Sequence, residues 1–248
     1  NMQTYYETKA CLFKNLSDDD SGIVPDSLSN VLLAAIASMQ ATLRMNWITF
    51  GKTSSANYTY NNGNIRWMLS GIEGAMSLSD SYFSNDVLGL NVAAAVAALR
   101  ECGCPVSAVQ SAVQKFSPLP HRMEEIGSFN GIRFVNDSKA TNMSALHAAL
   151  EMCPPRGRLI AGGVLKETDF KEVEEMLAKH VSSVYLIGEA STMMKEAWSS
   201  VVRCETCVGL EDAVHGAWKD AEPGETILLS PGCASFDQYR NYQCRGQQ

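Results

Sequence analysis

Three short runs of the sequence combine side chains that can bind an anion. Residues 136–142 hold an acid, a lysine, two hydroxyls and two amides, and residues 162–166 pair two glycines with Lys166. Residues 230–237 are mostly small and include Ser235. Glycines let a backbone approach a ligand closely, a lysine attracts negative charge, and backbone amides at the start of a helix bind phosphate or carboxylate. The three runs therefore predict a binding site for such groups.

Each run also has an ordinary structural explanation. Asn142 or Thr141 would cap a helix, Asp137 would serve in a turn, and Ser235 would cap a second helix. The glycine pair lacks the spacing of a dinucleotide-binding fingerprint and is weak evidence alone. Because all three runs follow predicted strands in one stretch of chain, we favour a shared site.

An arginine ahead of the first run is a further candidate for phosphate binding. Arg122 follows His121, and its planar guanidinium matches the geometry of a phosphate group. The alternative is a surface ion pair with Glu124 or Glu125, which would contribute only about 0–1 kcal/mol.

The elements that must position these residues follow a domain boundary. Residues 117–120 contain two prolines, which forbid a continuing helix, so we place domains at 1–118 and 119–248. The sequence then predicts a hairpin of 123–129 with 132–135, strands 158–161, 184–187, 201–204 and 226–229, and helices 143–151, 169–179, 191–198, 210–221 and 236–243. This alternation predicts a mostly parallel sheet with helices on both faces, where ligands bind at the carboxyl ends of the strands.

The first domain has its own pattern of helices and strands. The sequence predicts helices at 5–15, 27–43, 86–101 and 107–116, a turn at 17–22, a strand at 47–50 and a hairpin of 57–60 with 65–69. The fold class expected for the whole chain is therefore α/β.

Composition narrows the classes of function. The chain has 248 residues with 20 Lys+Arg and 27 Asp+Glu, a net charge of −7, which argues against nucleic-acid or anionic membrane partners. It is long enough to bury a core without disulfides, so the eight cysteines are expected to be reduced. We read no secretory signal at the N-terminus, and no apolar run approaches the roughly 20 residues that span a bilayer. We therefore expect a cytoplasmic location.

Taken in order, these motifs resemble the Mur ligase family, and within it the branch that adds D-glutamate. The resemblance is carried by residues 119–122, 136–142, 162–166, 229–237 and 241–246. It covers residues 119–246 and extends more thinly back to Tyr5. It implies that residues 1–118 are part of the family's central ATP-binding (ATPase) domain. Residues 119–248 would form its C-terminal domain, with a Rossmann-like, mostly parallel sheet.

The resemblance also implies a reaction. In this family ATP phosphorylates a carboxylate of a nucleotide-linked substrate, here UDP-N-acetylmuramoyl-L-alanine. The amine of D-glutamate then attacks the acyl phosphate, in peptidoglycan precursor synthesis. The implied catalytic residues are Lys9, His121 and Lys139, of which Lys9 would be carbamylated and help to hold Mg²⁺, a cation that prefers oxygen ligands. The implied nucleotide contacts are Asn91, Arg122, Asp137 and Lys139, and the implied D-glutamate contacts are Thr141, Lys166, Ser235, Phe236 and Tyr242.

The sequence also departs from the family pattern. Val164 replaces an acid that usually follows the paired glycines, and the His-Asn pair usual before Asn91 is missing. We find no P-loop, because the Gly-Lys-Thr-Ser run at 51–54 has Asn46 where a glycine is needed and precedes a hairpin. With no UDP-binding domain either, we expect a monomeric fragment that is inactive alone. The alternatives are a non-catalytic α/β anion-binding module derived from the family, and another amide ligase such as a polyglutamate synthase.

Overall fold

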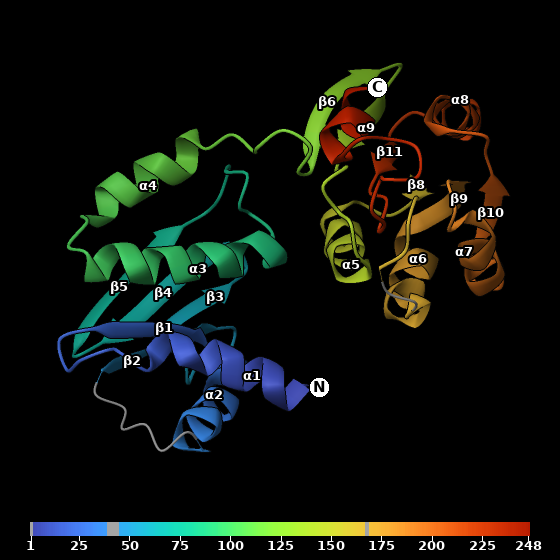
Figure 1. Ribbon diagram of the computed structural model, residues 1–248. Coiled ribbons are helices and arrows are strands. Elements are labelled where there is room, and N and C mark those ends of the chain that lie inside the picture. The colour runs from blue at the N-terminus through green and yellow to red at the C-terminus, as the bar shows by residue number, and fades with distance from the viewer. Residues whose placement is uncertain (1, 39–44, 167–168) are drawn as a thin grey trace. The chain divides into compact units, whose positions relative to one another are not determined.

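The computed structural model describes residues 2–38, 45–166 and 169–248, which form two compact units (Figure 1). Unit 1 comprises Asn1–Ser117 and unit 2 comprises Pro118–Gln248. The division therefore falls inside the run that contains two prolines. Among the described residues, no helix has the length and apolar character needed to span a lipid bilayer.

Unit 1 is built on a five-stranded sheet in the order β1-β2-β3-β4-β5. The strands are β1 (Ser21–Pro25), β2 (Asn46–Gly51), β3 (Tyr58–Asn61), β4 (Asn64–Leu69) and β5 (Ile72–Ser77). The helices are α1 (Met2–Ala10), α2 (Asp26–Ser38), α3 (Asp86–Glu101) and α4 (Val106–Lys115), with a 3-10 turn at Cys11–Phe13. The first three strands are parallel, and the last three pair antiparallel.

Helices cover both faces of the unit 1 sheet. Successive side chains of a strand point to opposite faces, so neighbouring residues of one strand pack against different helices. Ile48 of β2 lies in a core cluster with Tyr60 and with residues of α3, whereas its neighbour Trp47 packs against the cluster that contains Ala35 of α2. Gly89 of α3 permits a close approach to the sheet, since a Cβ at this position would lie 2.1 Å from the ring of Tyr60.

Several expectations for unit 1 are corrected by the structure. The helix expected at 5–15 ends as an α-helix at Ala10, and the turn expected at 17–22 overlaps β1. Neither β1 nor β5 was predicted. β1 has only five residues and is stabilised by parallel pairing with β2, a contact that local patterns do not reveal. Part of the helix expected at 27–43 lies outside the described residues.

Unit 2 is built on a six-stranded sheet in the order β10-β9-β8-β11-β7-β6. The strands are β6 (Glu124–Phe129), β7 (Ile132–Asn136), β8 (Gly157–Gly162), β9 (Val181–Ile187), β10 (Arg203–Thr206) and β11 (Thr226–Leu229). The helices are α5 (Met143–Met152), α6 (Glu174–His180), α7 (Ser191–Trp198), α8 (Leu210–Asp220) and α9 (Tyr242–Gln247), with a 3-10 turn at Phe170–Val173. Only β6 is antiparallel to its neighbour.

The sheet of unit 2 separates two hydrophobic layers. Leu159 and Leu186 pack in the cluster formed with α5, α6 and α7, whereas Ile160 and Tyr185 pack in the cluster formed with α8. Figure 1 shows α8 on one side of this sheet and α6 and α7 on the other. The predicted α/β fold with a Rossmann-like, mostly parallel sheet is confirmed.

The helix expected at 236–243 is wrong. The carbonyl of Ser235 accepts hydrogen bonds from the amides of Gln238 and Tyr239, which makes one turn and no helix. The backbone then becomes extended at Asn241, whose side chain accepts a hydrogen bond from the Cys244 amide (2.8 Å) and caps α9. Ser235 therefore caps no helix. The strand expected at 201–204 is β10, which begins two residues later.

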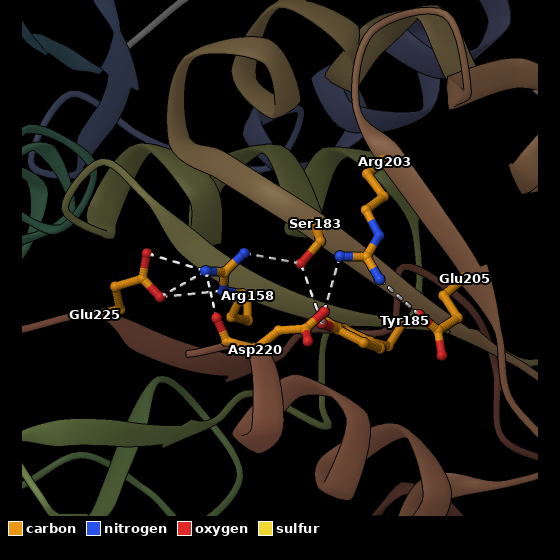
Figure 2. A network of polar contacts seen from close by, with 7 residues as sticks. All are labelled: Arg158, Ser183, Tyr185, Arg203, Glu205, Asp220 and Glu225. Carbon is orange, nitrogen blue, oxygen red and sulfur yellow. Dashed lines mark hydrogen bonds and ion pairs between the residues drawn. The ribbon is translucent and has the colours of Figure 1, made fainter. Parts of the chain in front are cut away.

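A polar network holds the amino ends of the central strands of unit 2 (Figure 2). Arg158, near the start of β8, forms a two-pronged pair with Glu225 that joins Nε to Oε2 (3.0 Å) and Nη2 to Oε1 (3.3 Å). Asp220 accepts hydrogen bonds from the Tyr185 hydroxyl (2.8 Å) and pairs with Arg203 (2.9 Å). The network lies at the opposite end of the strands from the three candidate loops.

Candidate ligand-binding site

The three candidate loops meet at one edge of the unit 2 sheet. They follow β7, β8 and β11, and β11 lies between the other two strands. The Ser230 hydroxyl donates to Asp137 Oδ2 (2.9 Å), which joins the loop after β11 to the loop after β7. Val164 and Ala234 exchange two backbone hydrogen bonds (2.8 and 2.9 Å), which join the loops after β8 and β11. These contacts bring the three runs into one site.

The paired glycines serve packing within this site. Gly162 and Gly163 have φ angles of 122° and 129°, which favour glycine. A Cβ on Gly162 would lie 2.0 Å from the carbonyl oxygen of Ile187, and a Cβ on Gly163 would lie 2.2 Å from that of Ala234. The close approach that the glycines permit is therefore to the backbone of this protein.

Helix α9 lies against the loop after β7. The Asn136 amide donates to the carbonyl of Gly246 (2.9 Å), and the Ser138 hydroxyl donates to the carbonyl of Tyr242 (2.8 Å). His121 is buried, with its Nδ1 3.0 Å from the Asn136 amide nitrogen and its ring edge-on to that of Tyr242. A Cβ on Gly246 would lie 2.3 Å from His121 Nδ1, so a side chain here would displace the buried His121 ring.

Asp137 is a buried carboxylate that links three segments. It is 7% exposed and accepts hydrogen bonds from the Ser230 hydroxyl and, at 3.2 Å, from the amide of Met123. Burial raises the pKa of Asp137 from 3.8 to about 6, although these two hydrogen bonds and the charge of Arg122 act in the opposite direction. Arg122 itself is exposed to solvent.

The remaining predicted contacts of unit 2 lie on the same loops and on α9. Lys139 Nζ lies 4.2 Å from the ring centroid of Tyr242, a cation–π distance. Lys166 donates to the Thr141 hydroxyl (3.3 Å). Ser235 is buried, whereas Phe236 is 71% exposed and offers an apolar ring to solvent. Each of the two predicted lysines therefore touches another predicted contact: Lys139 lies over Tyr242, and Lys166 is hydrogen-bonded to Thr141.

Lys9 and Asn91 belong to unit 1. Lys9 is exposed near the end of α1, with Nζ 5.5 Å from the ring centroid of Tyr5, and Asn91 lies on an exposed side of α3. Across residues 2–38, 45–166 and 169–248, no three His, Cys, Asp or Glu side chains are grouped as metal ligands.

Asn136, Ser138 and Arg245 lie in runs that the sequence analysis singled out, but sequence reasoning gave none of the three a role of its own. The Arg245 guanidinium is buried and contacts all three loops, through the Ser138 hydroxyl (3.0 Å) and the carbonyls of Ser138, Cys233 and Gly162. The signal was present in the 241–246 run, where an arginine precedes a glycine. The sequence could not reveal the role of Arg245, because its burial depends on loops that are distant from it in the sequence.

Comparisons with known proteins agree with this architecture. Residues 121–233 match the family model of the Mur ligase glutamate ligase domain. The UDP-N-acetylmuramoylalanine–D-glutamate ligase of Chlorobium phaeobacteroides (strain BS1) is 42% identical over 156 residues, which are 63% of this chain and 34% of the relative. The enzyme of the same name from Acidobacterium capsulatum is 32% identical over 250 residues, which are 100% of this chain and 54% of the relative.

Solved structures with low sequence identity share the fold. The MurF ligase from Thermotoga maritima in complex with ADP has a TM-score of 0.63 at 17% identity and covers 90% of this chain and 52% of its own. A bifunctional folylpolyglutamate synthase/dihydrofolate synthase from Yersinia pestis CO92 has a TM-score of 0.66 at 17% identity and covers 94% of this chain and 54% of its own. The chain spans about half the length, or less, of the curated relatives described above.

Proposed function

We propose that the chain is part of an ATP-dependent ligase of the Mur ligase family that joins D-glutamate to UDP-N-acetylmuramoyl-L-alanine. The match of residues 121–233 to the glutamate ligase domain of that family supports the proposal, as do the curated relatives. One observation carries this proposal: Lys139, Thr141 and Lys166 lie on converging loops, in a chain 32% identical along its whole length to a D-glutamate ligase. Convergent cations and hydroxyls suit a substrate with two carboxylates.

Different proposed contacts bind different parts of D-glutamate. Lys166 and Ser235 hold carboxylates, and the hydrogen bond from Lys166 to Thr141 orients the ammonium before the ligand arrives. Phe236 and Tyr242 pack beside the carbon chain. An amine held in this way attacks an activated carboxyl carbon, which forms the amide and releases phosphate.

Three of the proposed nucleotide contacts, Arg122, Asp137 and Lys139, belong to unit 2, and the fourth, Asn91, belongs to unit 1. Arg122 and Lys139 would hold phosphates and Asp137 the ribose, while Asn91 of unit 1 would contact the adenine side. Lys139 would also stabilise charge on the transferring phosphoryl group, which ATP supplies. His121 would position Tyr242 and Asn136, both of which it contacts. ATP use and a nucleotide-linked substrate favour a cytoplasmic enzyme, which we propose to be a monomer with small-molecule partners.

A magnesium ion belongs to the proposal for the whole ligase. The oxygen of a carbamylated Lys9 would suit this cation. Because the described residues group no acidic ligands around one point, we assign no step of the reaction to the metal.

Calorimetric titration with D-glutamate tests the proposed function. We expect the chain to bind D-glutamate and to bind L-glutamate at least about tenfold more weakly. With both carboxylates held by the proposed contacts, the two enantiomers direct the amine and the carbon chain differently, and only the D-form would fit beside Phe236 and Tyr242. Lys166→Ala should weaken D-glutamate binding by about tenfold, through loss of a charge-assisted hydrogen bond. Lys179→Ala, which removes an exposed lysine of α6, should leave binding unchanged. Equal affinity for both enantiomers, or an unaffected Lys166→Ala variant, would contradict the proposal.

A further inference from the structure

A buried arginine without a carboxylate partner occupies the centre of the candidate site. Arg245 is 1% exposed, and among the described residues no carboxylate lies within ion-pair distance of its guanidinium. Its Nη2 donates to the carbonyls of Ser138 (2.9 Å) and Cys233 (3.0 Å), and its Nη1 donates to that of Gly162 (3.4 Å). The guanidinium is hydrogen-bonded only to neutral groups, and Asp237 acts on its charge without forming an ion pair with it. Burying a cation in this way is costly, so its position calls for an explanation.

The groups that Arg245 contacts anchor all three loops. Ser138 and Cys233 lie in the loops after β7 and β11, and Gly162 is the last residue of β8, where the third loop begins. Every proposed D-glutamate contact lies within four residues of one of these anchors or of Arg245 itself. These contacts are Thr141, Lys166, Ser235, Phe236 and Tyr242. One guanidinium therefore fixes the backbone from which the whole set of side chains projects.

We propose that Arg245 is a positioning residue with two effects on the glutamate site. Its planar fork holds the three loops in register, and its charge, which forms no ion pair with the described carboxylates, favours a ligand with two carboxylates over one with a single carboxylate. The second effect rests on the proposed function. Charge acts over a longer range in a buried, poorly screened setting than in water, so the guanidinium can influence a ligand that it does not touch.

Hydrogen exchange of the ligand-free chain tests the first effect. The amides of Ala140, Val164 and Ala234 are hydrogen-bonded within the three loops and report on their register. An ammonium cannot reproduce the fork of a guanidinium, so Arg245→Lys should speed exchange at these amides by about tenfold. The amide of Cys207, bonded outside the site, should be unaffected. Unchanged exchange at the three loop amides would overturn the positioning role.

Titration with two ligands tests the second effect. D-glutamine has the shape of D-glutamate with one carboxylate replaced by a neutral amide. Arg245→Gln should weaken D-glutamate binding by about tenfold and D-glutamine binding by about threefold or less, whereas Arg245→Lys should keep the preference for D-glutamate. Arg240→Gln, the same change at an exposed arginine, should match the wild type.

The outcomes separate the two ideas. Equal losses for D-glutamate and D-glutamine in Arg245→Gln would mean that the residue acts on structure alone, and would overturn the charge effect. If the wild-type chain bound neither ligand, the proposed function would fail, and the charge effect with it. Hydrogen exchange would still decide the positioning role, because it needs no ligand. Since Arg245→Lys keeps the charge, it also provides a test if Arg245→Gln does not fold.

Discussion

At the scale of the residue, the burial of Asp137 makes the stability of the fold depend on pH. Its folded pKa of about 6 lies above the ordinary value of 3.8, so the folded state binds the proton more tightly. The resulting stabilisation is complete below pH 3.8 and is lost as the pH rises through 6. The difference corresponds to about 3 kcal/mol of unfolding free energy.

Asp137→Asn should therefore remove a pH-dependent loss of stability. We expect the variant to gain stability relative to the wild type between about pH 4 and pH 6, because the buried site no longer has to hold a charge. Calorimetric unfolding across this range measures the change. Asp18→Asn, at an exposed carboxylate of unit 1, should follow the wild-type profile. Parallel profiles for wild type and Asp137→Asn would show that burial does not control this carboxyl group.

At the scale of the element, α5 begins directly after the first candidate loop. The Asn142 side chain accepts a hydrogen bond from the amide of Ala145 (2.8 Å), which confirms one of the two predicted caps. Asn142→Ala should lower stability by about 1 kcal/mol, because it leaves a helix amide without a partner. Asn142→Asp should retain most of the wild-type stability. Denaturant unfolding of the two variants measures the difference, and equal stabilities would exclude a capping role.

How far the elements follow from the sequence depends on how local their signals are. Helices α3 and α7 and strand β11 have the predicted bounds, because hydrophobic spacing and flanking breakers lie within each segment. The helix expected at 236–243 failed because Asn241 caps a different helix. The convergence of the candidate loops followed from the alternation of strands and helices. The burial of Arg245 could not be predicted, because it requires loops from three strands to close around the side chain.

At the scale of the whole molecule, the chain consists of two units with separate cores. Each hydrophobic cluster draws its residues from one side of the boundary between Ser117 and Pro118. Phe116, next to that boundary, is 44% exposed and is a good site for cleavage by chymotrypsin.

Limited proteolysis should therefore release unit 2 in folded form. We expect brief chymotrypsin treatment to give a fragment that begins at Ser117 and keeps its helical circular dichroism and a cooperative thermal transition, because its core is complete. Mass spectrometry identifies the fragment. A released fragment without a cooperative transition would show that unit 2 depends on unit 1 for its stability.

The place of β11 in the sheet has a consequence for biosynthesis. β11 comes last among the strands of unit 2, yet it lies between β7 and β8, which have no hydrogen-bonded contact with each other. A ribosome that has released residues up to 220 has made both flanking strands but not the one that joins them. Contacts between such distant segments form slowly, since a long loop must close first. The nascent chain therefore has a gap between β7 and β8 until residues 226–229 emerge. We expect chaperones to bind the nascent chain most strongly during that interval.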